Sequence, residues 1–97
     1  MVNIGVPCSA AKEQSIFPCT REDEAVAIAA GMWLCGIDVT VFMQNSGFGH
    51  CIDIITSLIK PYRILVGLNI YPGSAMPQHE IMNKIDTKLY GILHDTH

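Results

Sequence analysis

Three short apolar segments, each rich in β-branched residues, recur along the chain at residues 2–6, 39–43 and 64–70. None of them alternates regularly between apolar and polar positions, a pattern typical of strands in a sheet covered on both faces. We therefore expect these segments to form the strands of a buried parallel sheet.

The sequence between the first two strands predicts a helix. Thr20 and Asp23 have the spacing of a capping box, which opens a helix through alanine-rich sequence to Cys35. Gly36 then suits the left-handed conformation that ends a helix. Beyond its first turn this helix carries no charge, so we expect it to be buried.

Two further helices follow. One is expected to begin at Ser46 or Gly49 and to run to Lys60, where Pro61 stops it. An amphipathic helix is expected over residues 79–90. Strands that alternate with helices predict an α/β domain with a parallel sheet.

Length and composition indicate a single domain that does not stand alone. The 97 residues are enough for one domain, so we assign residues 1–97 to it. Hydrophobic residues make up 49% and charged residues only 15% of the chain, and a small domain leaves much of its apolar surface uncovered. Such surfaces mark interfaces, so we expect an obligate subunit.

Several functional classes are excluded on composition. The net charge is −3 and basic residues do not cluster, which argues against nucleic-acid binding. The uncharged stretch over residues 25–37 is shorter than the ~20 residues that span a bilayer. The four cysteines are scattered and follow no secretory leader, so reduced thiols in a cytoplasmic protein are expected.

Ligands of parallel α/β sheets bind beyond the carboxyl ends of the strands, here residues 7–9, 44–47 and 71–73. Close to them in sequence, the first turn of the first helix holds Glu22, Asp23 and Glu24. Three acidic side chains at this position interact favourably with the helix dipole, and this interaction alone accounts for their presence. Glu22, however, shares a stripe with small residues that leave room for a flat ligand, although helical periodicity alone does not choose it over its two neighbours.

The second feature is the segment at residues 43–50, where a strand ends in a glycine turn. Glycines allow a backbone to approach a ligand closely. A tight strand-to-helix turn explains the same residues equally well, and the lysine of a phosphate-binding loop is absent.

The two segments together resemble a known family. Residues 21–31 look like the E-x-x-A-x-x-x-A-x-G helix start of thiamine-diphosphate enzymes, and residues 43–49 resemble the M-Q-N-S-G-x-G turn of the sulfopyruvate and phosphonopyruvate decarboxylases. Residues 5–9 are similar to the first strand end of that family, and residues 77–80 to a segment near its third loop. The resemblance implies a three-layer, parallel-sheet, thiamine-diphosphate-binding domain of the pyrimidine-binding (PYR) type, shortened between residues 10 and 18.

The resemblance also implies roles for individual residues. Glu22 matches the catalytic glutamate that hydrogen-bonds the aminopyrimidine ring of the cofactor and relays a proton. The residues expected to line the cofactor are Gln44, Asn45, Ser46 and Gly47. The residues expected to contact the substrate are Pro7, Cys8, Ser9 and His79.

The chain lacks the G-D-G…N signature with which the family holds the diphosphate and Mg²⁺. Sulfopyruvate decarboxylase often divides the two functions between subunits, so the resemblance implies an alpha-type subunit, without metal ligands of its own, that pairs with a beta-type subunit and self-associates. The implied reaction converts sulfopyruvate, a small anionic 2-oxo acid, to sulfoacetaldehyde and CO2 on the route to coenzyme M.

Other functions remain open from the sequence. Phosphonopyruvate is an alternative substrate that residues 77–80 favour. Residues 71–73 stand where an arginine–glycine pair is common in the family, and His50 stands where asparagine is frequent. A non-catalytic remnant that binds a partner and an unrelated α/β binding module are the alternatives to an enzyme.

Overall fold

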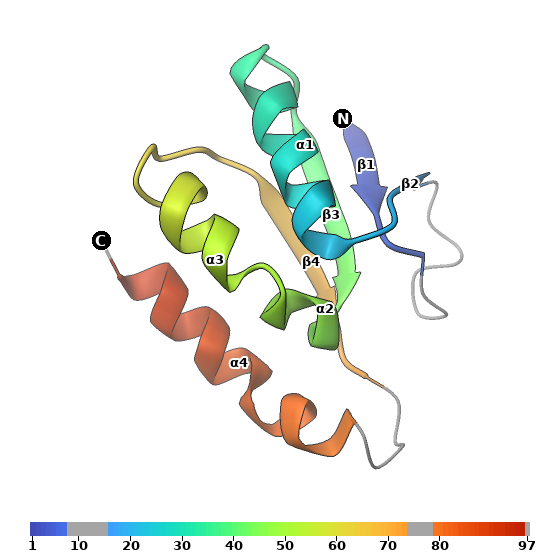
Figure 1. The fold of residues 1–97 in the computed structure, drawn as a ribbon, viewed down its shortest axis with the longest axis vertical. Coiled ribbons are helices and arrows are strands. Elements are labelled where there is room, and N and C mark those ends of the chain that lie inside the picture. The colour runs from blue at the N-terminus through green and yellow to red at the C-terminus, as the bar shows by residue number, and fades with distance from the viewer. Residues whose placement is uncertain (8–15, 74–78, 97) are drawn as a thin grey trace.

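Four parallel strands form one sheet in the computed structural model, which describes residues 1–7, 16–73 and 79–96 (Figure 1). The strand order is β2-β1-β3-β4. In chain order the elements are β1 (Val2–Gly5), β2 (Phe17–Pro18), α1 (Glu22–Leu34), β3 (Val39–Gln44), α2 (Asn45–Gly49), α3 (Ile52–Ile54), the π-helical turn η2 (Ile55–Ile59), β4 (Gly67–Tyr71) and α4 (Glu80–Asp95). The expected parallel α/β class is confirmed.

The register of the strands brings three chain segments to one edge of the sheet. Gly5 pairs with Phe42 between β1 and β3, and Gln44 pairs with Tyr71 between β3 and β4. A side chain at Gly5 would overlap the carbonyl oxygen of Phe42, so glycine is needed where these strands meet. The loops after β1, β3 and β4 therefore leave the sheet side by side.

The core lies between the helices and one face of the sheet. Val39, Val41 and Met43 of β3 pack in one cluster with residues of α1 and α2, whereas the intervening Thr40 and Phe42 lie outside that cluster. Strand β3 thus does alternate, and the described helices pack against the face that Val39, Val41 and Met43 present.

Helix α1 begins differently from the predicted capping box. Its N-cap is Arg21, which makes no side-chain capping bond. Thr20 instead donates to Glu24 Oε1 from its backbone N–H at 3.2 Å and from its hydroxyl at 3.1 Å, while Asp23 pairs with Arg21. The predicted capping box was wrong because Glu24, one helical turn after Thr20, accepts the hydrogen bonds of Thr20 in place of Asp23. The helix end was predicted correctly, since Gly36 has a φ of 85°.

The later helices agree with the prediction in position but not in continuity. The second expected helix is broken at His50 and Cys51 into α2 and a segment that ends in η2. The third is longer than predicted and reaches Asp95. The two-residue strand β2 was not predicted at all.

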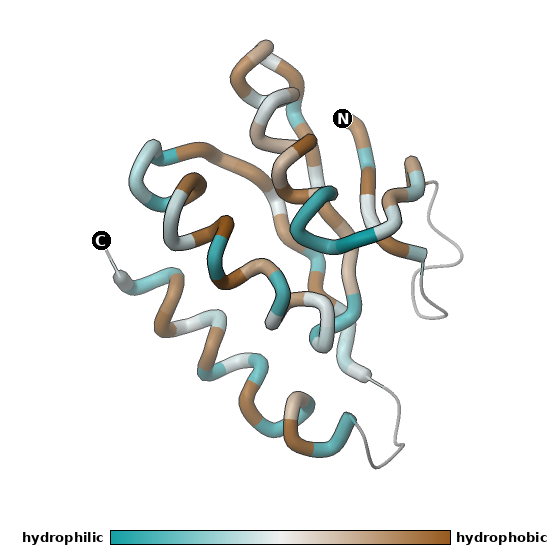
Figure 2. The backbone as a smooth tube through the Cα atoms, viewed as in Figure 1, coloured by the Kyte–Doolittle hydropathy of each residue, from teal (hydrophilic) through white to brown (hydrophobic). Residues whose placement is uncertain are grey.

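Helix α1 buries one apolar face and exposes another. Ala25, Val26, Ala29 and Ala30 are buried, while Ile28 and Leu34 are 44% and 69% exposed. Apart from its hydrophilic first turn, apolar residues occur all round this helix (Figure 2). The expectation of a fully buried helix is therefore correct for only one face within this single chain. None of the described helices has the length and apolar character needed to cross a membrane.

Candidate functional site

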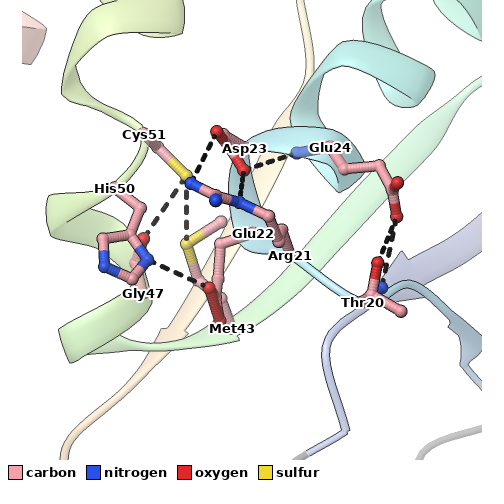
Figure 3. Close-up of polar contacts among 9 residues, drawn as sticks. All are labelled: Thr20, Arg21, Glu22, Asp23, Glu24, Met43, Gly47, His50 and Cys51. Carbon is pink, nitrogen blue, oxygen red and sulfur yellow. Dashed lines mark hydrogen bonds and ion pairs between the residues drawn. The ribbon is translucent and has the colours of Figure 1, made fainter.

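The strongest candidate site lies where α1 and α2 both begin, beside the carboxyl end of β3. Strand β3 ends at Gln44, and α2 starts at the next residue. Glu22, the first residue of α1, points toward Gly47 of α2 (Figure 3). The structure thus brings together Glu22 and the glycine turn, the two segments that carry the family resemblance.

Contact between Glu22 and Gly47 explains the need for glycine in this turn. A side chain at Gly47 would overlap Cγ and Cδ of Glu22. The Glu22 side chain is 17% exposed, so it is largely enclosed and still reachable from solvent. The space that a Cβ would take at Gly47 is thus filled by the Glu22 side chain.

The structure separates Glu22 from the two acids that follow it. Asp23 Oδ1 accepts from Arg21 Nε at 3.0 Å, and this hydrogen bond lowers the pKa of Asp23. Glu24 is occupied by Thr20. Glu22 alone among the three lies against α2 (Figure 3). Of the three acids, Glu22 is therefore the one placed beside the glycine turn.

Two residues of the break after α2 complete the surroundings of Glu22. His50 Nδ1 lies 3.4 Å from Glu22 Oε1, and the imidazole is 62% exposed. Cys51 is fully buried, with Sγ 3.5 Å from the carbonyl oxygen of Gly47. Burial, with the negative charge of Glu22 nearby, raises the pKa of Cys51 to about 12. The raised pKa favours the neutral thiol of Cys51 at physiological pH.

Asn45 ties the turn to α4. Its side chain is fully buried, and its Nδ2 donates to Asn83 Oδ1 and to Asp86 Oδ2, both at 2.8 Å. Its Oδ1 has no hydrogen-bond partner within the described part of the chain. Asn83 in turn binds Gly73, accepting from its N–H at 2.8 Å and donating to its carbonyl at 3.2 Å.

Asn83 and Asp86 were missed by the sequence analysis. A signal existed, because residues three apart share one face of a helix. Two short polar side chains on the same face of an otherwise apolar helix surface indicate a polar partner across the interface.

The remaining predicted residues are distributed around this edge. Pro7 is exposed just beyond β1, while Cys8 and Ser9 lie outside the described residues. Gln44 is half-buried and Ser46 is exposed, with 3.5 Å between Gln44 Oε1 and Ser46 Oγ. His79 is the N-cap of α4 and packs against Gly73, where a Cβ would meet its ring at 2.8 Å.

The chemistry available here is that of a carboxylate beside an open backbone turn. Such a group binds and relays a proton to a basic nitrogen. The described residues contain no cluster of three or more histidine, cysteine or acidic side chains able to hold a metal ion. The described cysteines, Cys19, Cys35 and Cys51, are free thiols.

Comparison with known proteins gives consistent results across several relatives, although no protein-family model matches the chain. Phosphonopyruvate decarboxylase of Streptomyces hygroscopicus is 34% identical over 103 aligned residues, covering 91% of this chain and 26% of that protein. Phosphonopyruvate decarboxylase of Streptomyces viridochromogenes is 41% identical over 68% of this chain and 18% of its own length. Sulfopyruvate decarboxylase subunit alpha of Methanocaldococcus jannaschii is 49% identical over 48% of this chain and 28% of its own length.

The matched region thus spans between about a fifth and a third of the curated relatives. It covers most of this chain in the first relative. These similarities agree with the resemblance carried by the segments around Glu22 and Gly47. Most of the chain is thus similar in sequence to part of the phosphonopyruvate decarboxylases, and about half of it to part of the sulfopyruvate decarboxylase alpha subunits.

Proposed function

We propose that this chain is the pyrimidine-binding part of a thiamine-diphosphate-dependent 2-oxo-acid decarboxylase, with Glu22 as its catalytic residue. The observation that carries the proposal is the contact of the Glu22 carboxylate with the side-chain-free backbone at Gly47. The relatives named decarboxylases support the reaction class.

The residues around Glu22 fit the aminopyrimidine of the cofactor. The ring is planar and carries hydrogen-bonding nitrogens, and the site offers a largely enclosed carboxyl group next to a turn without a side chain. Thiamine diphosphate, when bound, supplies the nucleophile that adds to the substrate carbonyl and the electron sink for decarboxylation. Gln44, Ser46 and the backbone of Gly47 would line its ring.

Glu22 would hold a proton at a carboxyl oxygen and share it with a ring nitrogen of the pyrimidine. Enclosure strengthens this hydrogen bond, because a low local dielectric favours charge-assisted contacts. His50, 3.4 Å from the same carboxyl group, would orient it. Pro7, Cys8, Ser9 and His79 would border the substrate at the neighbouring strand ends.

A partner subunit is the second part of the proposal. Three of the relatives are named as alpha subunits, a name that implies a partner subunit. The exposed apolar face of α1, with Ile28 and Leu34, is the surface that a beta-type subunit or a second copy would cover.

Sulfopyruvate is the substrate that we favour, because three of the relatives carry this name. Phosphonopyruvate is the second candidate, favoured by the longest match to this chain. Both are small anionic 2-oxo acids, and the anion that distinguishes them would lie near Gly73 and His79.

The test is reconstitution with the partner subunit. The chain is purified from its native lysate, and co-purifying proteins are identified by mass spectrometry. The complex is then assayed for CO2 release from sulfopyruvate and from phosphonopyruvate, with and without thiamine diphosphate. We expect a partner that contains a G-D-G…N motif and cofactor-dependent turnover of one substrate. A chain that purifies alone and turns over neither substrate would instead support the non-catalytic remnant.

A further inference from the structure

A partly buried hydrogen-bond network joins α2 to α4, and Asn45 is the one member of it that was expected to contact the cofactor. It consists of Asn45, Asn83, Asp86 and the backbone of Gly73.

We propose that Asn83 and Asp86 of α4 are positioning residues that act through Asn45 to hold the glycine turn against Glu22. On this account the side chain of Asn45 fixes the turn from behind and does not contact the cofactor. The proposal rests on the proposed function, because it assigns the turn to the cofactor site.

Burial and direction support this role for Asn45. Its side chain is fully buried, and both hydrogen atoms of its amide are donated to α4. It lies two residues before Gly47, whose backbone contacts Glu22. A bidentate amide contact to two side chains fixes the orientation of the first residue of α2, and a five-residue helix has little stability of its own.

Asn83 connects this turn with a second strand end. Its Oδ1 accepts from Asn45 Nδ2 and from the N–H of Gly73, and its Nδ2 donates to the carbonyl of Gly73. One side chain of α4 therefore holds the loop after β3 and the loop after β4 at a fixed separation. These are the loops between which the pyrimidine and the substrate would lie.

Asp86 fixes the network from the other side. Its Oδ2 accepts from Asn45, while its Oδ1 accepts from the backbone N–H of Thr87 at 2.7 Å. Because the carboxylate is anchored to its own helix, it offers Asn45 an acceptor in a defined position. On this account the glycine turn is well ordered only when α4 is docked against it through Asn83 and Asp86.

The first arm of the test measures the network without reference to catalysis. Hydrogen–deuterium exchange is followed in the complex for residues 44–49 and 71–73, comparing wild type with Asn83→Ala and Asp86→Ala. Asp95→Ala is the control, since Asp95 lies on the same helix and its side chain is 83% exposed. We expect faster exchange in both segments for Asn83→Ala, in residues 44–49 for Asp86→Ala, and in neither for the control.

The second arm measures the cofactor. We expect Asn83→Ala to weaken the apparent affinity for thiamine diphosphate about tenfold, while kcat at saturating cofactor falls much less. This split follows because a mobile turn lowers occupancy and leaves Glu22 in place. Asp86→Asn, which retains an acceptor for Asn45, should restore most of the affinity lost in Asp86→Ala.

The outcomes are distinguishable. Unchanged exchange in residues 44–49 for both alanine variants, or unchanged cofactor affinity in a complex that binds the cofactor, would overturn the proposal. If the wild-type complex does not bind thiamine diphosphate, the proposed function fails. The exchange arm then decides alone whether α4 positions the turn.

Discussion

At the scale of single residues, the site depends on which atoms of α2 leave space for Glu22. Gly47 and Gly49 are two residues apart in the same short helix, yet only Gly47 contacts the glutamate. A Cβ at Gly47 would overlap the Glu22 side chain, whereas a Cβ at Gly49 would meet nothing within 4 Å. The family motif contains both glycines, and the structure gives a steric reason for one of them.

This difference gives the first prediction. Gly47→Ala displaces Glu22 and should reduce decarboxylation by about a hundredfold, since misplacement of a reacting group by about 1 Å costs that much. Gly49→Ala is the matched control and should retain near-native activity. The measurement is kcat/KM of the reconstituted complex, together with a thermal melt of each variant. Equal activity of the two variants would show that the absence of a side chain at Gly47 is not needed to position Glu22.

The second prediction concerns Cys51. Its pKa is raised from 9.0 to about 12 in the folded protein, by burial first and by Glu22 second. The unfolded chain therefore loses this proton at lower pH than the folded chain does. The stabilisation is complete below pH 9 and is lost as the pH rises toward 12, by at most about 1.4 kcal/mol per pH unit.

Urea unfolding between pH 8 and pH 10.5 tests this prediction. The free energy of unfolding should fall less steeply with pH in Cys51→Ala than in wild type. Cys35→Ala, which removes an exposed thiol, should leave the slope unchanged. A Cys51→Ala variant with the wild-type slope would contradict the assignment.

At the scale of elements, the sequence predicted the strands and helices better than their ends. Strand β2 was missed because it has only two residues, Phe17 and Pro18, and both are exposed. No periodicity exists over so short a segment, and β2 forms by pairing with Ile4 and Gly5 of β1. The capping box failed for a similar reason, since Thr20 and Asp23 both had competing partners that local spacing does not reveal.

Helix α1 provides the third prediction. Gly31 is exposed in this helix, and a Cβ there would meet nothing within 4 Å. Gly31→Ala should therefore raise the free energy of unfolding of the isolated chain by about 0.5–1 kcal/mol through helix propensity. Denaturant unfolding measures this change. The same substitution at Gly5, where the new Cβ would overlap the carbonyl of Phe42, should be clearly destabilising.

At the scale of the whole molecule, composition correctly indicated an incompletely covered apolar surface. Ile28, Leu34, Ile81 and Ile92 are among the large hydrophobic side chains that remain exposed. For Ile28 and Leu34 the sequence did not reveal which face of α1 is exposed, because α1 is apolar all round and periodicity gives such a helix no direction. It also did not reveal the polar alternation of β3, since Phe42 interrupts it.

The fourth prediction tests the α1 face as the partner surface. Ile28→Glu places a charge in the proposed interface and should weaken partner binding by at least about tenfold, since a buried unpaired charge is costly. Ile92→Glu is the control, because Ile92 is an exposed isoleucine on a different helix. Association is measured by analytical ultracentrifugation. Native affinity in Ile28→Glu, or equal loss in both variants, would place the partner elsewhere.

The central claim is that Glu22 is the carboxylate that works on the cofactor. The most direct measurement compares Glu22→Gln with Glu24→Gln in the reconstituted complex, recording both turnover and thiamine-diphosphate binding. The account predicts that Glu22→Gln abolishes most of the decarboxylation while cofactor binding is largely kept, and that Glu24→Gln remains active. Wild-type turnover in Glu22→Gln would contradict it.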